Sequence, residues 1–241
     1  MFITPIAFLI TLISSVFWGT FDGLRKHLIA KLNHWTLLFY LSLFFSISFL
    51  TWILITKDFQ FNNSYLIYGS LTVVFNFLAN YYYIRAIEIS YISSVVPFLA
   101  FTSLFTALSG FIVLGETLSP LQILGIILVV VSSFFINYRK GVAVISSLTK
   151  NKGALLMILV SLLWALSAPF DKLAVEHSNT ITHSFIQSTF ITLLNLIMVI
   201  KFSKQRLIPD FFIAPRALIS ASIIAATALG LQFYAYTLMP V

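Results

Sequence analysis

The chain alternates between long apolar runs and short polar interruptions. Eight continuous runs, rich in Leu, Ile and Phe, approach the length of about 20 residues that an α-helix needs to cross a bilayer. They lie near residues 3–21, 35–56, 65–87, 93–114, 121–138, 154–171, 184–202 and 217–239. Strands of a membrane barrel would instead show segments of alternating polarity. The pattern predicts an all-α fold, a polytopic bundle of eight transmembrane helices joined by short connections.

The polar interruption at residues 115–119 predicts a tight reversal between the fourth and fifth helices. Gly115 is suited to a left-handed cap at the end of the fourth helix. Ser119 is suited to cap the fifth, with Pro120 at its first position and Gln122 reaching back to the cap. Glu116 then lies at the interface, near the positive end of that helix. A capping role for its carboxylate is favoured over a role in binding.

An internal repeat divides the chain into two copies of one unit. A shift of 146 residues aligns the first two spans with the sixth and seventh and pairs Trp18 with Trp164 and Asn33 with Asn179. The other identities in this alignment pair Ser15, Lys26, Thr36, Phe39, Ser42 and Phe44 with Ser161, Lys172, Thr182, Phe185, Ser188 and Phe190. A shift of 151 aligns the third span with the eighth. The predicted repeats are residues 1–140, with five helices, and 153–241, with three.

A unit of five helices enters the membrane upside down in its second copy. The loop after the first span carries Arg25, Lys26 and Lys31. The equivalent loop of the second copy carries Lys172 as its one basic residue, together with the acids Asp171 and Glu176. The loop after the second span shows the opposite bias. Twelve of the fourteen Lys and Arg residues lie on one face of the predicted bundle, which makes that face cytoplasmic and the N-terminus external. We therefore predict two inverted repeats.

The composition is typical of an integral membrane protein. Hydrophobic residues make up 60% of the 241 residues and charged residues 9%, and the mean hydropathy is +1.02. A soluble domain carries about 25% charged residues. The net charge of +7 is scattered between the apolar runs, which favours the lipid bilayer over nucleic acid as the partner. We expect a multi-pass protein of the cell membrane, inner or plasma.

Polar and aromatic residues inside the predicted spans are the candidates for a binding cavity, because polar side chains in hydrocarbon tend to face a cavity or another helix. The candidate binding residues are Trp18, Asn76, Asn80, Tyr83, Thr102, Trp164, Gln232 and Tyr236. For a single Thr, helix packing or a bond to the preceding turn is the favoured alternative. For the two asparagines, binding and interhelical packing are equally favoured. The two tryptophans lie at mid-span instead of in an interfacial belt, which favours a functional role.

Charged residues and histidines are expected near helix ends. Asp22 is expected to pair with Arg25 or Lys26, and Arg85 with Glu88 as an interfacial ion pair. The four histidines, His27, His34, His177 and His183, lie near span ends, where interfacial solvation is expected. They do not have metal-ligand spacing, and the chain has no cysteine. No metal site and no cofactor is predicted.

One region resembles a known family. "GETLSPLQILGIILVVVSSFFI" at 115–136, preceded by "IRAIEISYISSVVPFLAFTSLFTALSGFIVL", resembles the end of the EamA repeat of the drug/metabolite transporter superfamily, and "FWG" at 17–19 resembles its first helix. The second copy differs by having Ala165 after its tryptophan, where glycine would favour close helix packing. The resemblance implies a ten-helix transporter with inverted repeats, alternating access and a central cavity. It also implies cytoplasmic termini, in contrast to the charge distribution.

The hypothesis from this resemblance is secondary transport, import or export, of a small organic solute or metabolite. The chain shows no nucleotide-binding motif. One alternative is a membrane assembly subunit or fragment that does not transport; the other is an intramembrane enzyme acting on lipid, which needs a nucleophile with a base or paired carboxylates. We predict no enzymatic activity. The second repeat is expected to be truncated, which leaves a packing face for lipid or for a second copy in a homodimer.

Overall fold

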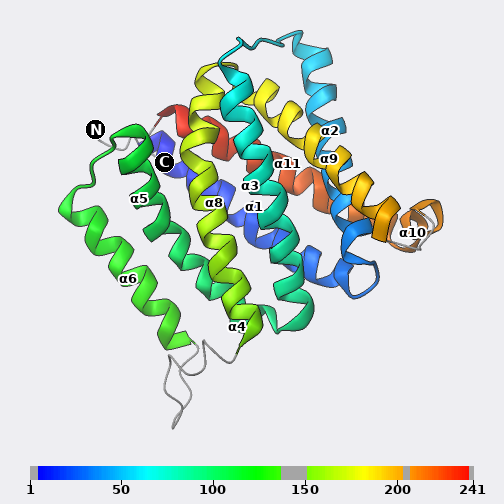
Figure 1. The fold of residues 1–241 in the computed structure, drawn as a ribbon, viewed down its shortest axis with the longest axis horizontal. Coiled ribbons are helices and arrows are strands. Elements are labelled where there is room, and N and C mark those ends of the chain that lie inside the picture. Colours follow the sequence, from blue (N-terminus) through cyan, green and yellow to red (C-terminus); the bar gives the residue numbers. More distant parts are fainter. Residues whose placement is uncertain (1–4, 137–150, 203–206, 239–241) are drawn as a thin grey trace. The chain divides into compact units, whose positions relative to one another are not determined.

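The computed structural model describes residues 5–136, 151–202 and 207–238, and these residues form helices and connections without a strand. The predicted span ends at residues 3–4, 137–138 and 239 lie outside the described residues. In chain order the elements are α1 (Pro5–Ile29), α2 (His34–Thr56), α3 (Tyr65–Ile89), α4 (Ile92–Val95), the 3-10 helix η1 (Val96–Ala100), α5 (Phe101–Leu114), α6 (Pro120–Ile136), α8 (Lys152–Glu176), α9 (Thr180–Phe202), α10 (Leu207–Ile213) and α11 (Pro215–Leu238) (Figure 1). The all-α prediction is confirmed.

Six helical segments are long and apolar enough to cross a membrane: Pro5–Ile29, His34–Thr56, Ile92–Leu114, Lys152–Glu176, Thr180–Phe202 and Pro215–Leu238. The third of these combines α4, η1 and α5, and Pro97 lies within its 3-10 turn. The other two predicted spans are also helical. However, α3 carries asparagines, tyrosines and a charged pair that lower its hydropathy, and α6 has 17 described residues. Length and composition thus support six of the eight predicted spans.

The chain forms two compact units. The first unit comprises Met1–Phe77 and Phe170–Pro240, and the second comprises Leu78–Pro169. Both α3 and α8 contribute a segment to each unit. In α8 the division falls directly after Pro169, a residue without the N–H that a helix interior normally uses.

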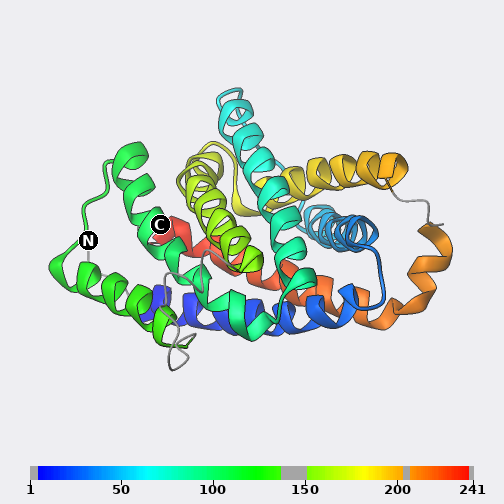
Figure 2. The same ribbon diagram turned by 60° about the horizontal axis from the view of Figure 1, so that its bottom comes forward.

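Two antiparallel helix pairs build most of the first unit. Figures 1 and 2 show α1 beside α11 and α2 beside α9. The α2–α9 contact includes hydrogen bonds in its interior: Asn195 Nδ2 donates to Ser42 Oγ at 3.2 Å, and Ser46 Oγ lies 2.6 Å from Thr189 Oγ1. Serine and threonine allow two helices to approach closely and bond across the contact. These bonds fix the register of α2 against α9.

Two asparagines that the repeat aligns have the same role in the structure. Asn33 caps α2, its side chain accepting from the Trp35 N–H at 2.9 Å. Asn179 precedes α9, and its Oδ1 accepts from the Thr182 N–H at 2.8 Å. Each asparagine satisfies an amide that the first turn of its helix leaves without a partner. The sequence identity at this position therefore reflects a shared helix start.

The predicted reversal between α5 and α6 is confirmed in the second unit. Gly115 ends α5 with φ of 68°, and its N–H donates to Phe111 O at 3.1 Å. Ser119 N–H donates to Gln122 Oε1 at 2.8 Å, and Ser119 Oγ accepts from the Gln122 N–H at 3.4 Å, which completes a capping box. These bonds satisfy amides at both helix ends.

Replacement of Gly115 with alanine is expected to lower the free energy of unfolding by about 1 to 2 kcal/mol, because a Cβ disfavours the left-handed conformation. Unfolding of the purified protein in detergent measures this change. Gly125 in α6 is the control, since it has a negative φ and open space around a new Cβ, so Gly125→Ala should be neutral or stabilising. Equal losses in the two variants would contradict the prediction.

The helices of the second unit also pack closely. Ser109 Oγ on α5 donates to Ala165 O on α8 at 2.6 Å, and Ala165 is fully buried. Alanine is therefore small enough for the close approach at the position after Trp164, where the family pattern has glycine. Ser161 Oγ adds a bond to Phe98 O at 3.1 Å. Small residues of α8 thus allow α5 and η1 to pack closely against this helix within the second unit.

Candidate functional site

Three of the predicted binding residues meet between α1 and α11 in the first unit. Trp18 Nε1–H donates to Gln232 Oε1 at 2.8 Å, and Gln232 Nε2–H donates to the Tyr236 hydroxyl oxygen at 2.6 Å. All three side chains are half-buried. Next to them, Ser14 Oγ donates to Ala228 O at 2.9 Å and joins the two helices. We call Trp18, Gln232 and Tyr236 the α1–α11 cluster.

Two further predicted residues meet in the second unit. The rings of Tyr83 and Trp164 lie 5.6 Å apart at a tilt of 35°, and Tyr83 is fully buried. Each of the two aligned tryptophans thus contacts the third helix of the other repeat: Trp18 contacts α11, and Trp164 contacts α3. The two predicted repeats therefore make equivalent contacts through their aligned tryptophans.

The remaining predicted residues have separate environments. Asn76, in the first unit, donates from Nδ2 to Thr72 O at 3.0 Å, which is the local bond that the packing alternative anticipates. Asn80 is half-buried in the second unit. Thr102, on α5, has a buried hydroxyl oxygen with no hydrogen-bond partner in the described part of the chain. The eight candidates divide equally between the two units.

A buried polar network in the first unit was not predicted. His183 Nε2 lies 3.0 Å from Asp171 Oδ1, and Gln187 Nε2–H donates to the same oxygen at 2.8 Å. The other ring nitrogen, His183 Nδ1, lies 3.1 Å from the Tyr65 hydroxyl. Relative exposure is 0% for His183 and 5% for Asp171. We call Tyr65, Asp171, His183 and Gln187 the acid–histidine network.

Helix geometry explains why these four side chains meet. His183 and Gln187 are four residues apart on α9 and therefore share one face. Asp171 lies more than one turn before the end of α8, because that helix continues to Glu176. At Gly69, a Cβ would come within 2.7 Å of the Tyr65 ring. Glycine at this position therefore leaves space for the Tyr65 ring, which is directed toward His183.

The connection between α2 and α3 covers the turn between α8 and α9. The Asn62 N–H donates to His177 O at 3.0 Å, and the Gln60 N–H donates to Thr182 Oγ1 at 3.2 Å. The Phe61 ring lies 5.9 Å from the Tyr65 ring. This cover overturns the expectation that all four histidines are solvated at the interface. His183 is enclosed by segments that are distant in sequence.

One phenylalanine joins the network to the α1–α11 cluster. The Phe233 ring on α11 lies 4.8 Å from the His183 ring and 6.0 Å from the Tyr236 ring, and its side chain is 1% exposed. The two groups of polar residues are therefore separated by a single aromatic ring. Both lie within the first unit.

The predicted ion pairs are present. Asp22 pairs with Arg25 on α1, and the Arg25 guanidinium also lies 4.4 Å from the centre of the Phe21 ring. Arg25 is 2% exposed, so this pair belongs to the interior of the first unit. Arg85 Nη1 pairs with Glu88 Oε2 at 2.5 Å near the end of α3, where both side chains are partly exposed. The second pair lies near a helix end, and its interfacial location stays a prediction.

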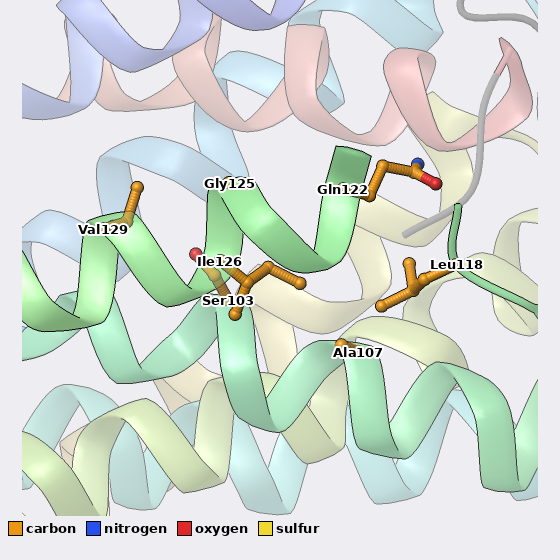
Figure 3. Close-up of a pocket in the computed structure, with 7 residues that line it drawn as sticks. All are labelled: Ser103, Ala107, Leu118, Gln122, Gly125, Ile126 and Val129. Carbon is orange, nitrogen blue, oxygen red and sulfur yellow. The ribbon is translucent and has the colours of Figure 1, made fainter. Parts of the chain in front are cut away.

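A groove of about 330 Å³ lies between α5 and α6 in the second unit (Figure 3). It is lined by Ser103, Ala107, Leu118, Gln122, Gly125, Ile126 and Val129. Only Ser103 and Gln122 offer polar side chains, and Gln122 is already engaged in the capping box. Solute sites usually combine an apolar wall with several convergent polar groups. This groove therefore offers fewer convergent polar groups than such sites usually have.

Comparison with known proteins identifies the family. The model of the EamA-like transporter family matches residues 5–138 and 151–241, which are the two halves that the internal repeat separates. No curated protein and no solved structure matches the chain. Multi-pass membrane topology and transport of small solutes are the general properties of this family. Since the two matches together cover nearly the whole sequence, the chain belongs to the EamA-like transporter family.

Proposed function

We propose that this protein is a secondary transporter that moves a small, uncharged or zwitterionic organic solute by alternating access, in two inverted repeats. The observation that carries the proposal is the α1–α11 cluster. It joins an indole N–H, an amide and a phenol at a helix contact formed between the two repeats. Aromatic faces and hydrogen-bonding groups without a formal charge suit such solutes.

Contacts within the first unit support an inverted arrangement with eight spans. The repeat aligns α2 with α9, and these two helices pack antiparallel. If each apolar helix crosses the membrane once, the α2–α3 connection and the α8–α9 turn belong on one side, and Asn62 bonds to His177 between them. The α1–α2 turn and the end of α9 belong on the other side. There the Trp35 and Phe202 rings stack at 6.2 Å.

The location of the cluster, at a contact between the two repeats, is the one that inverted-repeat transporters use for their solute. Their solute sites lie near the middle of the membrane at the contact between repeats. Trp18 is close to the middle of the 25-residue α1 and meets α11 from the second repeat. Rocking of one repeat against the other would change the contacts of all three cluster residues.

Transport is tested with purified protein in liposomes, using a set of radiolabelled amino acids as the probe. We expect uptake or exchange of at least one of them by the wild type. Trp18→Phe removes the N–H that bonds Gln232 and should reduce the rate about tenfold or more, as loss of a hydrogen bond worth roughly 1.4 kcal/mol predicts. Trp52→Phe is the matched control, because Trp52 on α2 is 57% exposed.

The outcomes separate the alternatives. Equal rates in Trp18→Phe and Trp52→Phe would remove Trp18 from the solute site. The absence of flux for every probe, in liposomes that contain folded protein, would favour a membrane assembly subunit. An intramembrane enzyme predicts a change in the lipids of the same liposomes.

A further inference from the structure

We propose that the Tyr236 hydroxyl recognises the solute through a hydrogen-bond acceptor, a carbonyl or carboxylate oxygen. This inference rests on the proposed transport function and adds the chemical group that the α1–α11 cluster binds. The observations that carry it are the direction of the hydrogen bonds within the cluster and the position of Tyr236 at their end.

The direction of these hydrogen bonds follows from Trp18. An indole N–H is a donor, and the ring offers no acceptor atom. The Gln232 side-chain atom that lies 2.8 Å from Trp18 Nε1 must therefore be the amide oxygen. An amide can often be turned around without a change in shape, but here the hydrogen-bond pattern allows one orientation. The Gln232 –NH₂ group consequently faces Tyr236.

The same reasoning continues from Gln232 to Tyr236. The two residues are four positions apart and share one face of α11. Gln232 Nε2 lies 2.6 Å from the Tyr236 hydroxyl oxygen, and because an amide nitrogen only donates, the hydroxyl oxygen must accept. The hydrogen of the hydroxyl then points away from Gln232. Tyr236 is thus the last donor in a row that begins at the indole.

The Tyr236 O–H has no acceptor among the residues that the structure describes. Its side chain is half-buried, so part of its surface remains accessible. A donor that is removed from water without an acceptor is unfavourable, and an oxygen of the solute satisfies it. Hydrogen bonds in a row also polarise one another, so the two bonds behind Tyr236 strengthen its O–H as a donor.

Buried phenylalanines hold the two accessible rings of the cluster in place. The Phe21 ring lies 5.7 Å from the Trp18 ring. The Phe233 ring lies 6.0 Å from the Tyr236 ring. Sites for small solutes usually combine such apolar surfaces with a few polar groups that fix orientation. We therefore expect a solute with an apolar side chain and an acceptor oxygen, as apolar amino acids have.

Binding to the purified full chain in detergent tests the proposal. The probes are leucine and phenylalanine, each with its carboxamide and with the amine that remains when the carboxyl group is removed. At a pH below the pKa values of their amino groups, the carboxamide and the amine carry the same charge and differ in the acceptor oxygen. Calorimetric titration measures the dissociation constants. The wild type should bind the carboxamide at least about tenfold more tightly than the amine.

Two variants remove the recognition in different ways. Tyr236→Phe keeps the ring and removes the hydroxyl, so the preference for the carboxamide should disappear. Gln232→Glu places a carboxylate oxygen where the –NH₂ group was, and this oxygen accepts from the Tyr236 O–H and turns it away from the solute. The preference should disappear here too, although the hydroxyl is present. Tyr234→Phe, at a 50% exposed position on α11, is the matched control and should keep it.

Equal losses of affinity for the carboxamide and the amine in Tyr236→Phe would assign the hydroxyl a structural role and overturn the proposal. A wild type that binds neither probe, or does not distinguish them, would also overturn it. If one variant does not fold, the other provides the comparison. Flux of amino acids in liposomes with unchanged selectivity in Tyr236→Phe would leave transport standing without this recognition. Selective binding without flux would support the recognition and contradict transport of these probes.

Discussion

Replacement of Asp171 with alanine is expected to lower the free energy of unfolding by about 3 to 5 kcal/mol, the usual cost of removing one partner from a buried pair. The carboxylate accepts from both Gln187 and His183, and these side chains are 3% and 0% exposed. Alanine leaves two buried donors without their acceptor. Equilibrium unfolding in detergent, followed by circular dichroism, measures the loss.

Asp171→Asn is the matched control for this prediction. Asparagine has nearly the same shape and keeps an oxygen that can accept from both donors, so a loss of only about 1 kcal/mol is expected. A double variant, Asp171→Ala with Gln187→Ala, should cost less than the sum of the single changes, because both remove the same bond. If Asp171→Ala and Asp171→Asn are equally stable, the acid–histidine network does not contribute as the structure indicates.

The helices and their caps could be predicted because they depend on nearby residues. The predicted span at 35–56 differs by one residue from α2, His34–Thr56. The reversal at Gly115 and Ser119 followed from turn chemistry, and it has the predicted left-handed glycine and capping box. The Asp22–Arg25 pair followed from spacing on one helix. In each case the partners lie within a few positions in the sequence.

The acid–histidine network was missed because its partners come from three helices. The predicted sixth span ends at residue 171, so Asp171 was treated as an end residue, but α8 continues to Glu176. His183 lies in the first turn of α9, where solvation is the usual expectation. The α2–α3 connection and Phe233 cover His183. The pattern of polar and apolar residues within α9 does not predict these contacts. The spacing of His183 and Gln187 was the available signal.

The candidate site was predicted in part for a related reason. Helical spacing identified polar and aromatic residues on the first and eighth spans, and Trp18, Gln232 and Tyr236 do bond to one another. Spacing alone does not indicate which faces meet. Asn76, chosen by the same rule, bonds within its own helix to Thr72. A residue type at a given spacing can satisfy its hydrogen bonds locally or across a contact, and only the packing decides between them.

Replacement of Phe233 with alanine is expected to lower the free energy of unfolding by about 3 to 5 kcal/mol, the range for buried Phe→Ala changes. The ring is 1% exposed and lies between His183 and Tyr236, so its removal leaves a cavity between two polar groups. Phe233→Leu keeps most of the volume and should cost less than about 1.5 kcal/mol. Detergent unfolding measures both changes, with Tyr234→Ala as the control, because the neighbouring Tyr234 is 50% exposed and should change stability by roughly 0.5 kcal/mol or less. A loss in Phe233→Ala no larger than that of Tyr234→Ala would show that α11 does not pack against His183 as the ring contact indicates.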